Sequence, residues 1–182
     1  MFPDVDVSDL LVVPTCQVRA ADEDARERPR ERQRRRARRR GRGRWRVRLT
    51  QKRVSQRTKM DLVQTGEDVD VEKDFCLERF IDFAKRVTDE LRAKGYWCDY
   101  IDPCSGLSMI NRDSQHIYGE VDALVTLLNY QTTNSGCCKV VLHPQWGSAV
   151  YPASLFTKAP ASALQEAIAV AERDIRANDP TA

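Results

Sequence analysis

The chain has 182 residues, of which 41% are hydrophobic and 31% are charged, and its formal net charge is +3. This length and hydrophobic content predict one globular domain with its own core. No apolar run approaches the roughly 20 residues that a transmembrane helix needs. The acidic start, MFPDVDVSDL, differs from a secretory signal or a mitochondrial presequence. These features argue against membrane insertion and predict a cytoplasmic protein.

Charge is distributed unevenly along the chain. Residues 18–56 contain sixteen Arg and one Lys against five acidic residues, a net charge of +12, and the remainder carries −9. This segment has almost no apolar residues, so it cannot bury enough surface to offset its ordering entropy, and we expect it to be disordered. A basic arm of this kind is typical of nucleic-acid binding. The alternative is a solvated insertion without a selected role.

Six cysteines lie at positions 16, 76, 98, 104, 137 and 138. An even number permits a disulfide framework. A chain of this length with an ordinary core does not need one, and we expect reduced thiols. Cys98 and Cys104 are six residues apart, unlike the closely spaced cysteine pairs of structural zinc sites. The sequence therefore predicts no metal-binding set within the chain.

Two strands and a long helix are predicted in the first half of the chain. Residues 10–17 are an apolar, β-branched run typical of a strand, and 60–66 are expected to form a strand and a turn. Residues 74–94 predict a helix that ends at Gly95, because apolar residues recur at i, i+3, i+4 and i+7. That apolar stripe consists of Leu77, Phe80, Ile81, Ala84, Val87 and Leu91.

Residues 96–110 predict a strand, a turn and a second strand, with turn chemistry in Asp102-Pro103. Asp99 and Asp102 have two interpretations. They could be paired carboxylates for acid–base chemistry, or they could be a solvent-facing strand residue and a turn residue. The second interpretation is favoured because Asp before Pro commonly opens a turn.

The rest of the chain is expected to form a helix, a loop, two strands and a final helix. Residues 121–128 suggest a short helix, and the polar segment 129–136 predicts a loop. Strands follow at 137–143 and 148–157, and residues 159–177 form an amphipathic helix. Strands that precede and interleave with helices predict an α+β fold, with packed helices on a mostly antiparallel sheet.

The segment GCCKVVLHPQWG, residues 136–147, is the part of the sequence most suggestive of chemistry. Successive side chains of a strand point to opposite faces, so only one of Cys137 and Cys138 can face the core. A partly exposed thiolate is a good ligand for a soft metal centre; the alternative is one core thiol with an accidental neighbour. A Cys137–His143 nucleophile pair is disfavoured, because six residues of strand span roughly 20 Å. His143 is instead expected at a strand end with a local hydrogen bond.

Several blocks of uncommon residues resemble one protein family. GYWCDYIDPCSGL at 95–107, GCCKVVLHPQWG at 136–147 and SLFT at 154–157 resemble the C-terminal domain of the cobalamin trafficking protein D family, the methylmalonic aciduria and homocystinuria type D proteins. The resemblance implies a fold similar to the flavin nitroreductases but without flavin. It places this domain at 1–17 and 57–177.

The same resemblance implies a non-enzymatic adaptor in vitamin B12 trafficking. Such an adaptor binds the type C cobalamin-processing protein and directs cobalamin to methionine synthase or methylmalonyl-CoA mutase. The chain alone would bind no cofactor. Cys137 would provide a thiolate to the cobalt of partner-bound cobalamin, with Cys138 as its inward or supporting neighbour. Cys98 and Cys104 stand at positions where members of the family usually have small residues without a thiol. We therefore assign no role to these two cysteines. The start of the chain favours the cytosolic branch, although the family is also mitochondrial.

The resemblance leaves residues 18–56 as an Arg-rich insertion and 178–182 as a tail. Every Val codon begins with GT and one Gln codon ends with AG, so a segment that opens with Val18 and closes with Gln56 suggests a retained intron. Two other functions stay open. One is a flavin- or thiol-dependent oxidoreductase on the same fold. The other is nucleic-acid binding through the insertion, which is less favoured because a basic segment without a fold is only an electrostatic footprint.

Overall fold

The computed structural model describes residues 10–16, 58, 61–113, 115–136 and 138–178, which fold into helices and antiparallel strands. In chain order the elements are β1 (Leu11–Cys16), α1 (Glu67–Ala93), β2 (Cys98–Tyr100), α2 (Glu120–Leu128), β3 (Gln131–Ser135), β4 (Cys138–Leu142), β5 (Pro152–Thr157) and α3 (Ala161–Asn178). The α+β prediction is confirmed. The predictions for 18–56 and for the tail beyond 178 lie outside the described residues.

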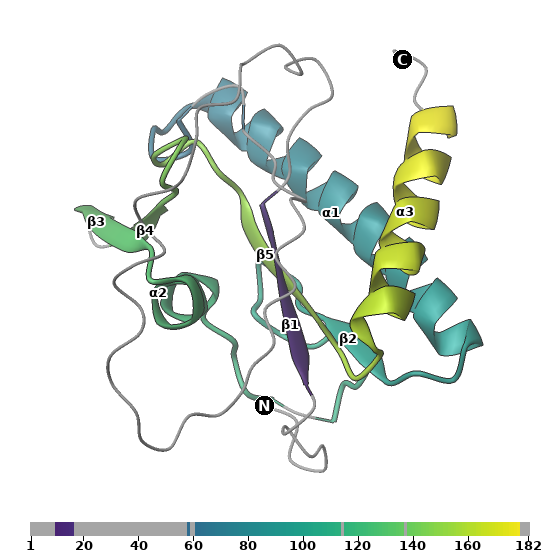
Figure 1. Cartoon of the computed structure of the whole chain (residues 1–182). Helices are drawn as coiled ribbons and strands as arrows, with labels where there is room; N and C mark the ends of the chain where they lie inside the picture. Colours follow the sequence, from purple (N-terminus) through teal and green to yellow (C-terminus); the bar gives the residue numbers. More distant parts are fainter. Residues whose placement is uncertain (1–9, 17–57, 59–60, 114, 137, 179–182) are drawn as a thin grey trace, which may run out of the picture.

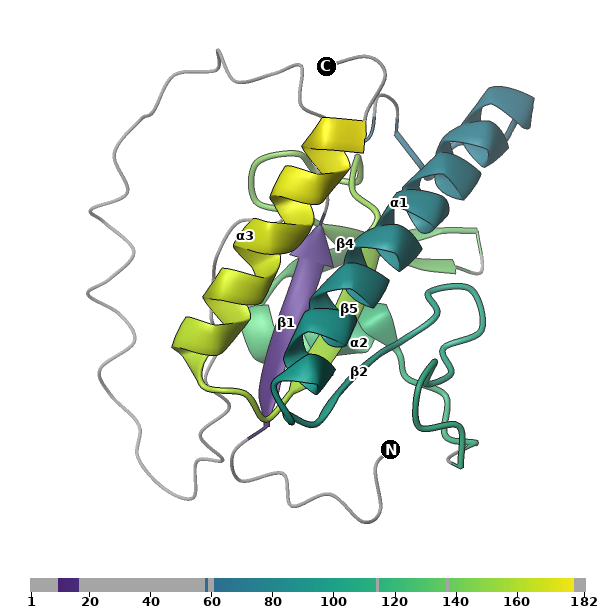
Figure 2. The same cartoon turned by 90° about the vertical axis from the view of Figure 1, so that its right-hand side faces the viewer.

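Strand β5 is the centre of a three-stranded sheet in the order β1-β5-β2. Both neighbours run antiparallel to it, and Thr157 is opposite Leu11 on one side and Cys98 on the other. Helices α1 and α3 lie side by side on one face of this sheet, and α2 lies on the other (Figures 1 and 2). Strands β3 and β4 form a separate antiparallel hairpin beside α2. The hairpin therefore belongs to the α2 side of the molecule.

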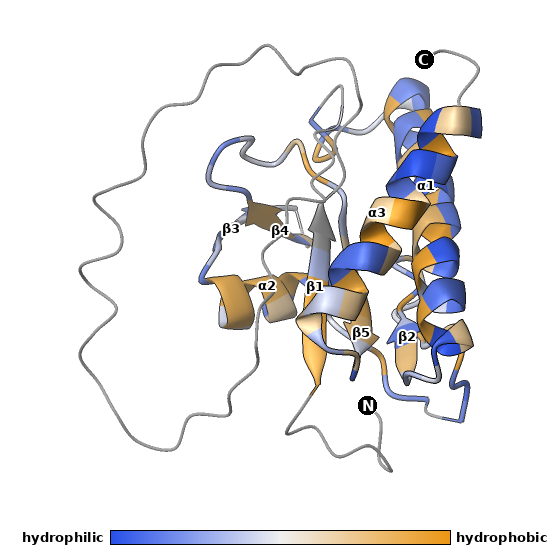
Figure 3. Ribbon diagram, turned by 45° about the vertical axis from the view of Figure 1, so that its right-hand side comes forward, coloured by the Kyte–Doolittle hydropathy of each residue, from blue (hydrophilic) through white to orange (hydrophobic). Residues whose placement is uncertain are grey.

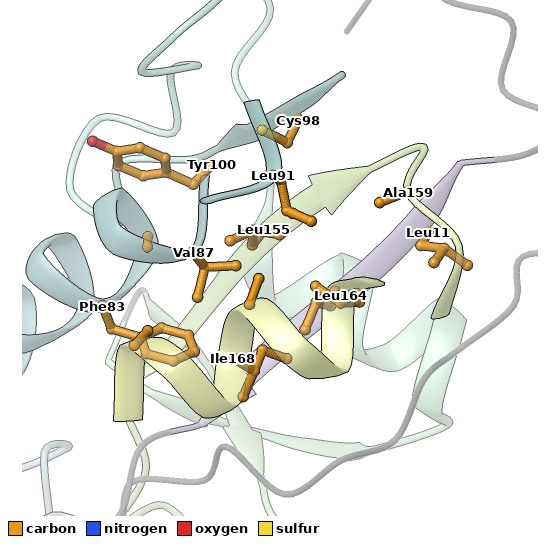
Figure 4. Close-up of a cluster of buried hydrophobic side chains, with 14 of the residues drawn as sticks. Leu11, Phe83, Val87, Leu91, Cys98, Tyr100, Leu155, Ala159, Leu164 and Ile168 are labelled. Carbon is orange, nitrogen blue, oxygen red and sulfur yellow. The ribbon is translucent and has the colours of Figure 1, made fainter. Parts of the chain in front are cut away.

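The sheet is buried on both faces, which explains the uninterrupted apolar run LLVV in and before β1. Leu11 and Val13 join the cluster under α1 and α3, whereas Leu10 and Val12 join a second cluster on the opposite face. Figure 4 shows Val87 and Leu91 of α1 close to Leu155 of β5 in the first cluster. The alternation of a strand thus divides one hydrophobic run between two cores.

The long helix begins earlier than the periodicity predicts. It starts at Glu67, and Glu67, Asp68 and Asp70 in its first turn match the positive end of the helix dipole. Its apolar stripe faces the sheet, and both α1 and α3 carry hydrophilic and hydrophobic surfaces (Figure 3). The predicted stop is confirmed, since Gly95 follows the helix with a φ of +79° and its N–H donates to the Arg92 carbonyl at 2.9 Å.

Three local predictions are wrong. Residues 129–136 were expected to be a loop, but 131–135 form β3, because a polar strand gains hydrogen bonds from β4 without burying a face. Residues 61–66 form turns and bends instead of a strand. The second strand expected before Ile110 is reduced to a single bridge between Ile101 and Ser108. Within the described residues, no helix is both long and apolar enough to span a bilayer.

Candidate functional site: a cysteine hairpin beside a cavity

The predicted cysteine segment is one arm of the β3–β4 hairpin. Its last described pair is Ser135 opposite Cys138, so two residues, Gly136 and Cys137, connect the strands. Gly136 has a φ of +59°, a left-handed conformation that glycine adopts without steric penalty and that tight hairpin turns require. Cys137, the predicted cobalt ligand, lies outside the described residues. The structure nevertheless describes both sequence neighbours of Cys137, namely Gly136 and Cys138.

Cys138 is exposed, with a free thiol. It shares a face of β4 with Val140 and Leu142, whereas Val141 on the opposite face is buried against α2. Cys138 was expected to be an inward or a supporting neighbour of Cys137, and the inward alternative is therefore wrong. The cause is the register: Val141 is the buried residue of β4, and Cys138 lies on the opposite, outer face. A thiol at this end of the hairpin is accessible to another molecule.

His143 is a packed strand-end residue, as predicted. It is 9% exposed, and its Nδ1 accepts a hydrogen bond from the Gln145 N–H at 3.2 Å. Its ring stacks on Trp146 with centroids 4.1 Å apart and meets Tyr130 edge-on at 5.4 Å. Because these contacts fix the ring, His143 anchors the far end of the hairpin.

The other described cysteines differ sharply in accessibility. Burial is the main factor that raises the pKa of Cys76 to about 12 and that of Cys98 to about 11. Such thiols stay protonated at neutral pH and are poor metal ligands. Cys104 is exposed and lies at the cavity described next. Among the thiols that the structure describes, Cys104 and Cys138 are thus the ones that another molecule can reach.

A cavity of about 390 Å³ lies between the turn after β2, the start of α2 and β4. Its apolar wall includes Ile117, Tyr118 and Tyr151. The complete lining is Pro103, Cys104, Ser105, Gly106, Ile117, Tyr118, Gly119, Glu120, Val121, Asp122, Lys139, Tyr151 and Pro152. Since Lys139 directly follows Cys138, the cavity and the exposed thiol share one strand. The sequence analysis missed this cavity, because its lining comes from separate segments.

An ion pair joins the hairpin to α2 at the cavity. Lys139 Nζ lies 2.7 Å from Asp122 Oδ1, and both side chains are substantially exposed, at 48% and 75%. Below this pair, Leu124 of α2 packs with Val141 of β4 and Val150. The buried contacts, and not the exposed pair, therefore hold the hairpin on the helix.

We expect Lys139→Ala to lower the free energy of unfolding by less than about 1 kcal/mol, because water screens exposed ion pairs. Urea denaturation followed by circular dichroism measures this difference. Val141→Ala, which removes buried methyl groups from the same strand, should lower the free energy of unfolding more than Lys139→Ala does. A Lys139 variant that was as unstable as the Val141 variant would contradict this account of the interface.

Glu120, the first residue of α2, is a buried acid on the cavity wall. It is 9% exposed, and its Oε2 accepts a hydrogen bond from Ser154 Oγ of β5 at 2.6 Å. Ser154 Oγ also lies 3.4 Å from the Tyr118 hydroxyl oxygen. Oε1 is buried and accepts no hydrogen bond from any residue that the structure describes. Burial raises the pKa of Glu120 to about 7, and hydrogen bonds from Ser154 oppose this shift.

Glu120 should make stability fall as the pH rises. Its pKa is higher in the folded chain than its usual 4.5, so the folded chain binds more protons between these values. The free energy of unfolding then decreases from pH 4.5 to pH 7, by about 3 kcal/mol in total. We expect Glu120→Gln to be more stable than the wild type at pH 8 and equal to it near pH 4.

Urea denaturation at both pH values tests this effect. Glu67→Gln is the matched control, because Glu67 is also the first residue of a helix but is exposed. The control should show no gain at pH 8, where it loses at most about 0.5 kcal/mol because the Glu67 charge is favourable at the start of α1. A Glu120→Gln effect that is the same at pH 4 and pH 8 would contradict the raised pKa.

Asp99 and Asp102 do not form an acid–base pair. Asp102 caps its turn as predicted, accepting hydrogen bonds from Cys104 N–H at 3.1 Å and Ser105 Oγ at 2.7 Å. Asp99 was favoured as a solvent-facing residue, which is wrong, since its exposed fraction is 0%. Its carboxylate accepts hydrogen bonds from the loop that follows, including those from Ser108 Oγ at 2.5 Å and Asn111 Nδ2 at 2.7 Å. Both aspartates are structural.

The fold and the hairpin define a class of protein: an α+β domain that presents a cysteine at the end of a β-hairpin. Comparison with known protein families assigns the chain to a family. The family model described as "Methylmalonic aciduria and homocystinuria type D protein" matches residues 46–168. This match covers more than half of the chain, and the chain belongs to this family. The hairpin and the whole cavity lining fall within the matched residues.

Individual relatives agree with this assignment. Cobalamin trafficking protein CblD from Homo sapiens is 41% identical over 106 residues, which cover 58% of this chain and 36% of the human protein. The Rattus norvegicus protein of the same name is 41% identical over 108 residues, 59% of this chain and 36% of its own length. The Gallus gallus protein is 36% identical over 111 residues, 61% of this chain and 38% of its own length. The matched part is thus little more than a third of these relatives.

Proposed function

We propose that this chain is a non-enzymatic adaptor in cobalamin trafficking and that it offers a cysteine thiolate to the cobalt of cobalamin held by a partner protein. The single observation that carries the proposal is the exposed cysteine end of the β3–β4 hairpin in a member of this family. Three relatives carry the name cobalamin trafficking protein, which supports cobalamin as the molecule that is trafficked. The α+β arrangement is compatible with a fold of the flavin nitroreductase type, which we include in the proposal.

Within this proposal, Cys137 is the ligand and Cys138 is its supporting neighbour. A thiolate is a soft donor suited to a transition metal such as cobalt. Cys138, the sequence neighbour of Cys137, is exposed at the end of the hairpin. The buried Cys76 and Cys98 do not fit this role, because burial holds their pKa values far above neutral pH. The proposed partner is the type C cobalamin-processing protein, with methionine synthase as a further recipient.

A visible absorption spectrum tests the proposal. The chain is mixed with the type C partner and with cobalamin that has been reduced and then oxidised. We expect a new cobalt–thiolate band that disappears in Cys137→Ser and persists in Cys138→Ser. Cys104→Ser is the control for an accessible thiol outside the hairpin and should keep the band.

Two outcomes would contradict this assignment. A band lost in Cys138→Ser and kept in Cys137→Ser would make Cys138 the ligand. No band with a well-folded wild-type chain would contradict cobalt ligation itself. A yellow protein with bound flavin, or turnover of a disulfide by the chain alone, would instead favour an oxidoreductase.

A further inference from the structure

We propose that α2 and the β3–β4 hairpin open from the three-stranded sheet as one unit, and that ionisation of the Glu120 carboxyl group favours this opening. The hairpin shares a hydrophobic cluster with α2. The Glu120 carboxyl group, which bonds α2 to the sheet, has one buried oxygen without a donor among the described residues. The opening is a conformational change of the chain itself and does not depend on cobalt ligation.

The unit of α2 and the hairpin has a core of its own. The cluster that joins them takes all its described residues from one stretch of chain, 121–150. The cluster under α1 and α3, on the other side of the sheet (Figure 1), takes none of its described residues from that stretch. Contiguous supersecondary units often open separately, at a lower free energy than the whole domain. Separating this unit from the sheet would therefore leave both clusters intact.

The apolar contact between this unit and the sheet is small. Among the described residues of the cluster on that face of the sheet, Leu127 alone comes from α2 or the hairpin, and it is half-buried. A backbone hydrogen bond from the Thr58 N–H to the Ala149 carbonyl, at 3.2 Å, lies beyond the hairpin. The hydrogen bond between Glu120 and Ser154 is a direct polar contact between α2 and β5. A change at Glu120 therefore acts where the unit meets the sheet.

A charge on Glu120 is unfavourable while the unit is closed. Glu120 is buried, and among the described residues only Ser154 donates to its carboxyl group. A buried carboxylate with an incomplete set of donors is destabilising, and burial accordingly raises the pKa of Glu120 from 4.5 to about 7. Opening returns the group to water. The closed form is therefore most stable below pH 4.5, and its advantage is lost as the pH rises toward 7.

Other ionisable groups line the cavity around Glu120 from each neighbouring element. They are Tyr118, Asp122, Lys139, Cys104 and Tyr151. Burial raises the pKa values of Tyr118 and Tyr151, so neither hydroxyl is charged near neutral pH. Asp122 and Lys139 form an exposed ion pair with each other. Burial and the hydrogen bonds from Ser154 are the influences that set the pKa of Glu120.

Amide hydrogen exchange, followed by NMR spectroscopy from pH 5 to pH 8, tests this coupling in the wild-type chain. When closing is fast, the exchange rate of an amide is its opening equilibrium constant multiplied by the chemical rate, which rises about tenfold per pH unit. Loss of the Glu120 proton adds nearly another tenfold per unit between about pH 5 and pH 6.5. We therefore expect the exchange of β3 and β4 amides to accelerate about 100-fold per pH unit in that range and about tenfold per unit above pH 7.5.

Glu120→Gln should reduce this acceleration to about tenfold per pH unit throughout, because its side chain does not titrate. His143, which follows β4, can titrate in the same range. It is unchanged in this variant, so the comparison separates the two groups. Glu67→Gln, at an exposed helix start, should keep the wild-type dependence. Leu127→Ala should raise hairpin exchange roughly tenfold at every pH without changing its pH dependence, because it weakens the apolar contact with the sheet.

Three results would overturn the inference. If the hairpin amides open with the same free energy as the core amides of α1 and α3, the unit does not open separately. If wild-type hairpin exchange accelerates only as steeply as the chemical rate, the opening does not release a proton from Glu120. If the steeper dependence survives in Glu120→Gln, another group, such as His143, controls the opening.

Discussion

Replacing Asp99 with alanine should lower the free energy of unfolding by about 3–5 kcal/mol, because it leaves several buried donors without an acceptor. Asp99 accepts hydrogen bonds from the N–H groups of Tyr100, Ile110 and Asn111 at 2.7, 3.1 and 3.0 Å. The Ser108 hydroxyl and the Asn111 side-chain amide add two more. One carboxylate thus fastens the loop at 108–111 to β2. Urea denaturation followed by circular dichroism measures the loss.

Asp102→Ala is the matched control, because Asp102 makes a similar set of bonds in an exposed turn. Water can replace those bonds, so the control should lose about 1 kcal/mol or less. Amide hydrogen exchange adds a local measure: in Asp99→Ala the Ile110 and Asn111 amides should exchange much faster. Equal losses in the two variants would show that burial does not distinguish these aspartates.

Phe80→Ala should lower the free energy of unfolding by about 3–5 kcal/mol, the usual range for deleting a fully buried aromatic side chain. Phe80 is 0% exposed in the core between α1, α3 and the sheet, and its ring meets Tyr100 edge-on with centroids 6.1 Å apart. The variant leaves a void under the long helix and removes this aromatic contact. Urea denaturation is again the measurement.

Val71→Ala is the control on the same helix, since Val71 is 64% exposed. It should change the free energy of unfolding by no more than about 0.5 kcal/mol. Phe80→Leu, which keeps much of the volume, should fall between the two variants. An alanine variant at Phe80 as stable as Val71→Ala would mean that this core repacks without a void.

The parts of the fold that are stabilised by their own apolar face were predictable. Helices α1 and α3 repeat apolar residues at helical spacing, and β1 and β4 contain continuous apolar runs. Strand β3 was not predictable in this way. Its sequence, QTTNS, has no apolar residue, and the hydrogen bonds that make it a strand come from its partner β4. A strand that is stabilised by hydrogen bonds from a partner strand, as β3 is by β4, has no recognisable pattern in its own sequence.

The site was predictable where it depends on one segment and not where it depends on contacts between segments. Two adjacent cysteines before an apolar run indicated a presented thiol, and Cys138 is exposed. Which face of β4 is buried depends on how α2 packs, so the inward alternative for Cys138 is wrong, and its supporting role stays a prediction. Asp99 is buried only because the loop at 108–111 folds back over β2. Glu120 becomes part of a cavity only when α2, β4 and the turn after β2 meet.

The central position of β5 has a consequence for the synthesis of the chain. Strands β1 and β2 do not pair with each other, and both pair with β5, which ends at Thr157. On the ribosome, β1 therefore emerges long before β5, its sheet neighbour in the described part of the chain, has been translated. Contacts so distant in sequence slow folding and leave an apolar strand uncovered while the chain grows. A nascent chain released before residue 152 should lack the three-stranded sheet altogether, and its Leu10–Val13 run would be a substrate for chaperones.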